Sequence, residues 1–235
     1  MSHISIEGLN AGYGQFQALF DLDLEVLAGS RTAIIGANGA GKSTLLRSIV
    51  GQVDIRSGSI RIDGRDLGAS RTQRRAGAGV ALVPEGRHLF ATLTVRDNLL
   101  VGAHTRRPGP WNLDAVLDTF PLIRPLVGRR ADGLSGGEKQ AVAIGRALMS
   151  NPNVLLLDEV SLGLAPVIVG DLYAAIADVA DAGTTVVVVE QDIIQATAFA
   201  DVVHCLLEGR VVLSGPPGEL ELDDIRNAYF GVAVS

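Results

Sequence analysis

The stretch that decides the fold is Gly36-Ala37-Asn38-Gly39-Ala40-Gly41-Lys42-Ser43-Thr44. It fits the pattern G-x-x-x-x-G-K-[ST] and lies between a short apolar run, Thr32–Gly36, and a helical pattern, Ser43–Val50. Glycines in such a turn let backbone N–H groups face phosphate oxygens, and the start of the next helix adds partial positive charge. A plain glycine turn would explain neither the Lys-Ser pair nor its spacing. We therefore predict that the whole stretch holds the phosphates of a nucleotide, with Lys42 near the β- and γ-phosphates and Ser43 offering its hydroxyl to Mg²⁺.

An apolar run that ends in two acids lies downstream, at Val154–Glu159. Asp158, at the expected end of a strand, suits a contact to the magnesium shell. Glu159 is then placed to orient or deprotonate an attacking water, because phosphoryl transfer depends mainly on positioning and charge neutralisation. An acidic strand end alone is common and is usually just solvated. With a phosphate loop upstream, we favour the catalytic interpretation.

Leu134-Ser135-Gly136-Gly137-Glu138 stands at the start of a second helical pattern, Ser135–Met149. A serine followed three residues later by a glutamate is a capping box, which accounts for Ser135 and Glu138. It does not account for two consecutive glycines in the first helical turn, where each lowers helix stability. Glycines there expose backbone donors, so we predict a second phosphate-binding helix end. Two such elements in one chain suggest that two chains clasp the nucleotide between them.

Alternating strand and helix patterns predict an α/β fold. Three runs, Val80–Pro84, Val154–Asp158 and Thr184–Glu190, are apolar and β-branched or leucine-rich, as parallel strands buried on both faces are. Near the start of the chain, Ile4–Leu9 and Leu22–Val26 alternate apolar with polar or small residues, which favours strands with one covered face.

The middle of the chain differs from both flanks. From about residue 89 to residue 150 no strand run is visible, and the helical segments are interrupted by Arg107-Pro108-Gly109-Pro110 and by Pro121. The run Val167–Ala180 that follows has apolar residues at helical spacing. We therefore expect one domain over residues 1–235, with a nucleotide-binding core of residues 1–88 and 151–235 and an inserted helical part of residues 89–150.

Composition narrows the class of protein further. The formal net charge is −6, which disfavours sequence-independent binding to nucleic acid, so we expect no nucleic-acid partner. The single cysteine, Cys205, rules out an intrachain disulfide and lies in an apolar run that favours an inert buried thiol. Neither a secretory signal nor an apolar run of ~18 residues is visible, so we expect a cytoplasmic chain that other chains bring to a membrane if it works there.

Taken together, these motifs resemble those of ABC-type ATP-binding subunits, and the resemblance covers essentially the whole chain. Gly36–Thr44 is similar to their Walker A motif, Asp158 with Glu159 to the end of Walker B, and Leu134–Glu138 to the ABC signature. The resemblance implies an ABC-type ATPase that uses ATP and Mg²⁺. It also implies a phosphate-loop NTPase core with a mostly parallel sheet, an antiparallel N-terminal β subdomain and an inserted helical subdomain.

In the family that the chain resembles, two subunits pair head to tail, and the signature turn of one completes the ATP site of the other. The resemblance therefore implies that Ser135, Gly136, Gly137 and Glu138 contact nucleotide held by a partner. Tyr13 matches the family's aromatic residue that stacks on adenine. An ordinary core or turn tyrosine is the alternative for that position.

Four further stretches resemble one subgroup, the second ATP-binding subunit of branched-chain amino acid importers, with urea and amide importers close by. They are Val83–Arg87, Asp158–Pro166, Val189–Gln191 and Ala228–Gly231. The resemblance implies a second ATP-binding subunit, identical or different, together with membrane permease subunits and, indirectly, a solute-binding protein. It places the chain on the inner face of the cell membrane, held there by the permeases, and implies that residues 86–98 line the groove that receives a permease helix.

Two residues depart from the general family pattern at positions that bear on hydrolysis. Glu85 stands where the family usually has the glutamine that touches Mg²⁺, and its carboxylate still suits the metal shell. Gln191 stands where the family has its switch histidine; glutamine donates a hydrogen bond to the γ-phosphate but carries no proton that titrates near neutral pH. We expect inequivalent ATP sites in the assembled transporter and slow hydrolysis by this subunit alone.

Two other functions compete with transport. A soluble, non-transport ABC ATPase of DNA repair or translation control would have a long coiled-coil insertion or two ATPase halves in one chain, and this sequence has neither. A phosphate-loop kinase or GTPase from outside the ABC group would leave the Ser135-Gly136-Gly137 turn without a role. We favour an ATPase subunit that powers import of branched-chain amino acids or a related small polar solute.

Overall fold

The computed structural model of this chain describes residues 3–68 and 72–231. A six-stranded sheet forms the centre of the molecule and has the strand order β10-β9-β3-β8-β7-β6, parallel except for β10 at one edge. Its strands are β3 (Arg31–Ile35), β6 (Val80–Val83), β7 (Val154–Asp158), β8 (Thr185–Glu190), β9 (Val202–Leu207) and β10 (Arg210–Gly215). The predicted α/β fold with a mostly parallel sheet is confirmed.

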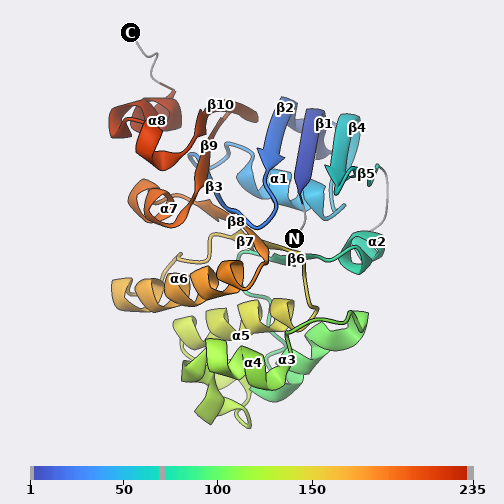
Figure 1. Cartoon of the computed structure of the whole chain (residues 1–235), viewed down its shortest axis with the longest axis vertical. Helices are drawn as coiled ribbons and strands as arrows, with labels where there is room; N and C mark the ends of the chain where they lie inside the picture. The colour runs from blue at the N-terminus through green and yellow to red at the C-terminus, as the bar shows by residue number, and fades with distance from the viewer. Residues whose placement is uncertain (1–2, 69–71, 232–235) are drawn as a thin grey trace.

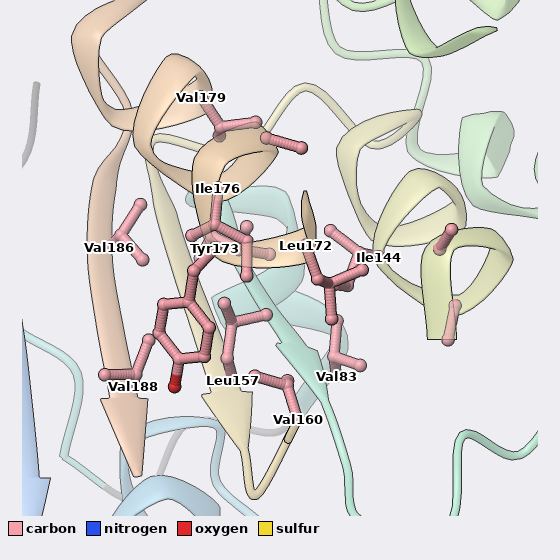
Figure 2. Packing of buried hydrophobic residues seen from close by; sticks show 14 of the residues in the cluster. Val83, Ile144, Leu157, Val160, Leu172, Tyr173, Ile176, Val179, Val186 and Val188 are labelled. Carbon is pink, nitrogen blue, oxygen red and sulfur yellow. The ribbon is translucent and has the colours of Figure 1, made fainter. Parts of the chain in front are cut away.

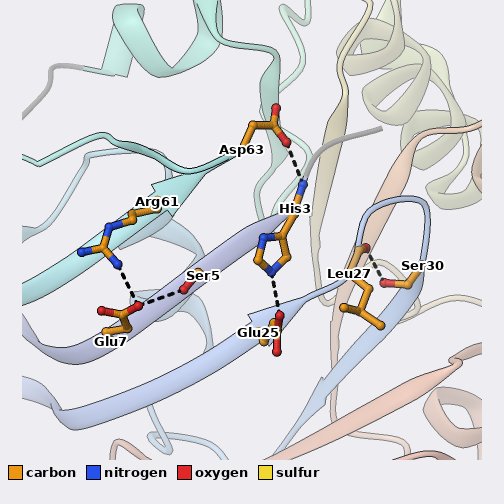
Figure 3. Close-up of polar contacts among 8 residues, drawn as sticks. All are labelled: His3, Ser5, Glu7, Glu25, Leu27, Ser30, Arg61 and Asp63. Carbon is orange, nitrogen blue, oxygen red and sulfur yellow. Dashed lines mark hydrogen bonds and ion pairs between the residues drawn. The ribbon is translucent and has the colours of Figure 1, made fainter.

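A second, antiparallel sheet is built mainly from the N-terminal part of the chain. Its strand order is β2-β1-β4-β5, and the strands are β1 (Ile4–Tyr13), β2 (Phe16–Val26), β4 (Asp54–Ile62) and β5 (Arg65–Asp66). Polar pairs link its strands at one end: the His3 ring lies 2.9 Å from a Glu25 oxygen, and Arg61 donates to Glu7 at 2.7 Å (Figure 3). The expected antiparallel N-terminal β part is therefore present.

The helices flank both sheets, and α3, α4 and α5 gather at the end of the molecule away from the antiparallel sheet (Figure 1). The α-helices are α1 (Lys42–Ile49), α2 (Thr72–Gly77), α3 (Val95–Gly102), α4 (Leu113–Thr119), α5 (Gly136–Leu148), α6 (Pro166–Asp181), α7 (Ile193–Phe199) and α8 (Leu222–Phe230). Short 3₁₀ turns occur at Ala103–Thr105, Pro121–Leu126, Ala131–Gly133 and Pro217–Glu219.

Two hydrophobic cores lie on opposite faces of the six-stranded sheet, because successive side chains of a strand point to opposite faces. In β7, Leu155 and Leu157 belong to one core, whereas Val154 and Leu156 belong to the other. The first core contains side chains of α4, α5 and α6, and Figure 2 shows members from α5 and α6. The second core contains side chains of α1 and of the antiparallel sheet. The central strands are thus buried on both faces, as their unbroken apolar runs predict.

Helices also account for the segment that we expected to be inserted into the core. Residues 95–148 contain α3, α4, α5 and 3₁₀ turns, with one isolated β-bridge between Thr94 and Arg130. These helices do not form a core of their own, since Leu99, Val116 and Ile144 belong to the same cluster as Leu155 and Leu157 of the sheet. The boundaries of a helical subdomain at residues 89 and 150 stay a prediction.

Candidate functional site: a nucleotide pocket at the carboxyl edge of the sheet

The phosphate loop runs from the end of β3 to the start of α1. Gly41 is the residue before α1 and has φ 105° and ψ 1°, a left-handed conformation that glycine adopts without strain. No side chain caps this helix end, so its first N–H groups are free of the usual capping oxygen and suit an anion. At Gly36 a Cβ atom would lie 2.3 Å from the Leu206 carbonyl oxygen. The loop therefore follows a path that larger residues could not take at these two positions.

Lys42 begins α1, and its ammonium group is nearly buried, with 4% of the residue exposed. Its Nζ donates to the carbonyl oxygens of Gly36 at 2.7 Å and Ala37 at 3.2 Å, and it lies 3.7 Å from an oxygen of Glu159. Burial lowers the pKa of Lys42, and the neighbouring carboxylates oppose that shift. A buried cation held against the mouth of the loop is well placed to meet phosphate oxygens.

Ser43 and Asp158 meet across the site. The Ser43 hydroxyl donates to Asp158 Oδ1 at 2.9 Å, whereas Asp158 Oδ2 is buried without a hydrogen-bond partner. Burial raises the pKa of Asp158, because a carboxylate loses hydration there. An unpartnered buried carboxylate oxygen beside a serine hydroxyl fits Mg²⁺, which binds proteins through one or two carboxylates and takes its other ligands from water and substrate phosphates.

Glu85 offers a second carboxylate, on the wall of a cavity that Ser43 also lines and Asp158 does not. Among residues 3–68 and 72–231 there is no group of three or more histidine, cysteine or acidic side chains that could hold a metal by itself. The donor set thus fits a metal that is bound together with nucleotide, in agreement with the predicted roles of Ser43, Asp158 and Glu85. Those roles stay predictions.

Glu159 follows β7 in a left-handed backbone conformation, with φ 49°, and its N–H donates to the Val189 carbonyl oxygen at 3.0 Å. Non-glycine residues rarely adopt this conformation, and such strain collects at functional sites. The Glu159 carboxylate accepts a hydrogen bond of 2.8 Å from Gln191 Nε2. The structure therefore brings together the two residues that we predicted to be catalytic, although they come from different loops, after β7 and after β8.

Apart from Asp158, the side chains described above line one cavity of about 570 Å³. Most of the predicted phosphate-loop residues line it, as do Glu85, Glu159 and Gln191. The phosphate-loop members on its wall are Asn38, Gly39, Gly41, Lys42, Ser43 and Thr44. Gly36, Ala37 and Ala40 do not line the cavity; the first two instead offer their carbonyl oxygens to Lys42. Three residues that the sequence analysis missed, Phe16, Ala18 and Leu162, also line it.

Tyr13 is not on the cavity wall, whereas Phe16 is. The two residues are paired across the hairpin between β1 and β2, and both are exposed, Tyr13 at 41% and Phe16 at 69%. The hairpin therefore places one aromatic ring, that of Phe16, on the cavity wall, and the predicted role of Tyr13 stays a prediction. Phe16 could have been identified from the sequence, because the two-residue turn Gly14-Gln15 predicts that it pairs with Tyr13 across a hairpin.

The signature turn lies away from this cavity, at the start of α5 in the helical part of the molecule (Figure 1). Ser135 and Glu138 form the expected capping box: the Ser135 N–H donates to Glu138 Oε2 at 2.7 Å, and the Glu138 N–H donates to Ser135 Oγ at 3.4 Å. At Gly137 a Cβ atom would lie 2.5 Å from Ile168 Cγ2 of α6. Close helix packing therefore supplies a local reason for this glycine that the sequence analysis did not consider.

A phosphate loop, a glutamate directly after one strand and a glutamine directly after the next line one cavity, and together they define a phosphate-loop nucleotide hydrolase. The family model described as ABC transporter matches residues 19–161, and the chain belongs to that family. It is an ABC-type ATPase and an ATP-binding subunit.

Two relatives match over nearly their whole length. The chain is 42% identical to the high-affinity branched-chain amino acid transport ATP-binding protein BraG of Pseudomonas aeruginosa, over 97% of this chain and 99% of that one. It is 38% identical to the probable branched-chain amino acid transport ATP-binding protein LivF of Archaeoglobus fulgidus, over 90% and 91%. The fold is similar to that of an ATP-binding cassette of an ABC transporter in its ADP conformation, with a TM-score of 0.80, 25% identity and coverage of 97% and 94%.

Proposed function

We propose that this chain hydrolyses ATP to drive import of branched-chain amino acids, or of a related small polar solute, through a membrane permease. Two observations support the proposal: the likeness to BraG across both chains, and the convergence of Lys42, Glu159 and Gln191 on one cavity. The second of these carries the chemistry, because it joins a phosphate-binding cation to a carboxylate placed for a water.

In this mechanism the phosphate loop binds the β- and γ-phosphates through backbone N–H groups, and Lys42 turns from the loop carbonyls toward them. Ser43 and Asp158, with Glu85 at the wall, would hold Mg²⁺, which when bound neutralises phosphate charge. Glu159 orients the attacking water and accepts its proton. Gln191 donates through Nε2, which holds Glu159 before nucleotide arrives and is free to turn toward the γ-phosphate afterwards.

The nucleotide site is completed by a second ATP-binding subunit. The signature residues Ser135, Gly136, Gly137 and Glu138 lie outside the cavity of their own chain, as they would if they served the cavity of a partner. We propose that this partner, identical or different, pairs head to tail with the chain. Size-exclusion chromatography with light scattering on the Glu159→Gln variant, with and without MgATP, tests the pairing, and a variant that stays monomeric in both conditions contradicts it.

A permease subunit would dock beside β6, which is the edge strand of the six-stranded sheet. A groove of about 270 Å³ opens between β6, α3 and α5, and Leu82, Val101 and Ala147 are on its wall. None of residues 86–98, which the resemblance assigns to the permease groove, lines this one, although Phe90 within that segment is 50% exposed. In residues 3–68 and 72–231 no helix is long and apolar enough to cross a bilayer. The permeases would therefore hold this subunit at the inner face of the membrane, with the solute-binding protein reaching it only through them.

The experiment for the whole proposal is uptake into vesicles that contain the chain, its partner ATPase and the cognate permeases. Loaded with ATP, they should take up radiolabelled leucine in the presence of the solute-binding protein, and vesicles with Glu159→Gln should not. A conservative exposed change, Asp171→Asn on α6, is the matched control. ATP hydrolysis without uptake of leucine, urea or short amides would favour the non-transport ATPase instead.

A further inference from the structure

A buried carboxylate lies directly behind the predicted catalytic pair. Glu190 is the last residue of β8 and is 2% exposed. Three donors surround it: Tyr173 Oη at 2.7 Å and the Ser161 N–H at 3.3 Å from Oε1, and Ser161 Oγ at 2.7 Å from Oε2. Figure 2 shows Tyr173 reaching from α6 past Val188 to this end of the sheet. Both carboxylate oxygens are therefore hydrogen-bonded by the chain itself.

One partner of Glu190, Ser161, belongs to the loop that carries Glu159, whereas the other, Tyr173, lies on α6. Ser161 is two residues after Glu159, and Gln191 directly follows Glu190. Val160, which lies between Glu159 and Ser161, is fully buried in the core, and Ser161 is hydrogen-bonded to Glu190. The segment that carries Glu159 is therefore anchored by Val160 and by Ser161. One carboxylate thus ties the loop after β7 to the end of β8, and the 2.8 Å bond from Gln191 to Glu159 spans the same two segments.

Stability alone does not explain a carboxylate at this place. Burial raises the pKa of Glu190, and the hydrogen bonds from Tyr173 and Ser161 only partly offset that shift. None of the ion pairs found within residues 3–68 and 72–231 involves Glu190. Burial of a carboxylate costs hydration free energy, which an apolar residue of similar volume would not lose. An apolar residue could not accept the directional hydrogen bonds that connect the two loops.

We propose that Glu190 is a positioning residue for ATP hydrolysis: held by Tyr173 and Ser161, it fixes the loop that carries Glu159 against the loop that carries Gln191. It acts through those residues and has no contact with nucleotide, since it does not line the cavity. The inference rests on the proposed catalytic role of Glu159. Loss of the Glu190 carboxylate should slow the hydrolysis step and leave nucleotide binding nearly unchanged. The hydrogen bonds of Lys42 go to the carbonyl oxygens of Gly36 and Ala37 in the phosphate loop, and its contact with Glu159 is longer, at 3.7 Å.

The main variant is Glu190→Gln, which keeps the shape of the side chain but replaces one acceptor oxygen by a donor. Displacements of about 1 Å in catalytic groups cost up to about 100-fold in rate, so we expect kcat to fall between about 10- and 100-fold. KM for ATP and the Kd of a fluorescent ADP analogue should stay within about twofold, because binding in the ground state is not affected.

Two matched pairs separate positioning from stability. Ser161→Ala removes the hydroxyl, and Ser161→Thr restores one, so kcat should fall in the first variant and recover in the second. Tyr173→Phe removes one hydroxyl from α6, whereas Ile176→Val shortens a neighbouring core side chain on the same helix and lowers the melting temperature without removing a hydrogen bond. Only Tyr173→Phe should lower kcat. The Ser161 pair also keeps the test valid if Glu190→Gln does not fold.

Glu159→Gln is measured beside these variants to distinguish two failures. If it abolishes hydrolysis while Glu190→Gln keeps the parent kcat, the positioning role is wrong and the catalytic role of Glu159 stands. If both keep the parent kcat, the proposed mechanism itself is wrong. The inference is overturned if Tyr173→Phe and Ile176→Val lose kcat equally and in proportion to their losses in melting temperature. Glu190 would then have only a structural role.

Discussion

Removing the charge of Asp158 should make the protein more stable without metal and less responsive to metal. In Asp158→Asn, Oδ1 keeps its hydrogen bond from Ser43, and the unpartnered charged oxygen Oδ2 becomes a neutral amide nitrogen. An unsatisfied buried polar group costs about 1–3 kcal/mol, and a charged one more, so the exchange should gain about 1–2 kcal/mol. For a chain of this size that corresponds to a rise of roughly 2–8 °C in melting temperature.

In the presence of magnesium nucleotide, the parent protein should have the higher melting temperature, the reverse of its order with Asp158→Asn in EDTA. A ligand at about 100 times its Kd stabilises by about 2.7 kcal/mol, or roughly 5–10 °C here. The parent protein should show this rise with MgADP and a much smaller one with ADP and EDTA. Asp158→Asn should lose most of the difference between the two conditions, because it lacks the second oxygen that suits the metal shell.

Scanning calorimetry in EDTA alone, in ADP with EDTA, and in MgADP provides the measurement. Asp171→Asn changes an exposed aspartate on α6 and should leave all three melting temperatures within about 1–2 °C of the parent, which corresponds to about 0.5 kcal/mol. The reasoning is refuted if Asp158→Asn melts below the parent in EDTA, since the buried oxygen would then be no burden. It is refuted equally if the magnesium-dependent rise survives the substitution.

Three further outcomes follow from the site and the helix that begins at the signature turn. Phe16→Ala should weaken ATP binding more than Tyr13→Ala by fluorescence titration, because Phe16 lines the cavity and Tyr13 does not; equal losses would contradict this. Gln191→His should raise kcat of the isolated chain if glutamine limits hydrolysis there, and a parent already fast and unaffected by the change would disprove it. Gly137→Ala should lower stability by about 1–3 kcal/mol in urea unfolding, because its Cβ would clash with a neighbouring helix. Gly170→Ala, with nothing near its Cβ, should instead gain about 0.5–1 kcal/mol. A change of the same sign in both variants would refute the packing argument.

Local chemistry allowed much of the fold to be predicted from the sequence. The strands expected at Val154–Asp158 and Thr184–Glu190 match β7 and β8 to within one residue, because long β-branched or leucine runs leave few alternatives. By contrast, β4 is interrupted by polar residues and glycine, and β9 is a short apolar run whose periodicity does not separate strand from helix. Neither strand was identified from sequence.

The sequence predicted those parts of the candidate site in which a short motif has one characteristic chemical role. A Lys-Ser pair after a glycine turn, and two acids at a strand end, indicate phosphate and metal chemistry without knowledge of the tertiary structure. Phe16 was missed because aromatic residues are common in strands, and only the hairpin brings this one to the cavity wall. Glu190 was quoted within a resemblance and given no role, since the contacts with Tyr173 and Ser161 join residues far apart in the chain.

The two glycines of the signature turn have a structural reason that the sequence did not reveal. Two glycines at the start of α5 were taken to need a second phosphate, since a capping box explained only Ser135 and Glu138. Packing against α6 now accounts for Gly137, and a Cβ atom on Gly136 would already lie 3.1 Å from Leu164 Cδ2. The glycines therefore no longer require a partner's nucleotide by themselves. The case for two clasping chains rests instead on family membership and on a cavity that none of the four residues lines, so it is best decided by measuring dimer formation with MgATP.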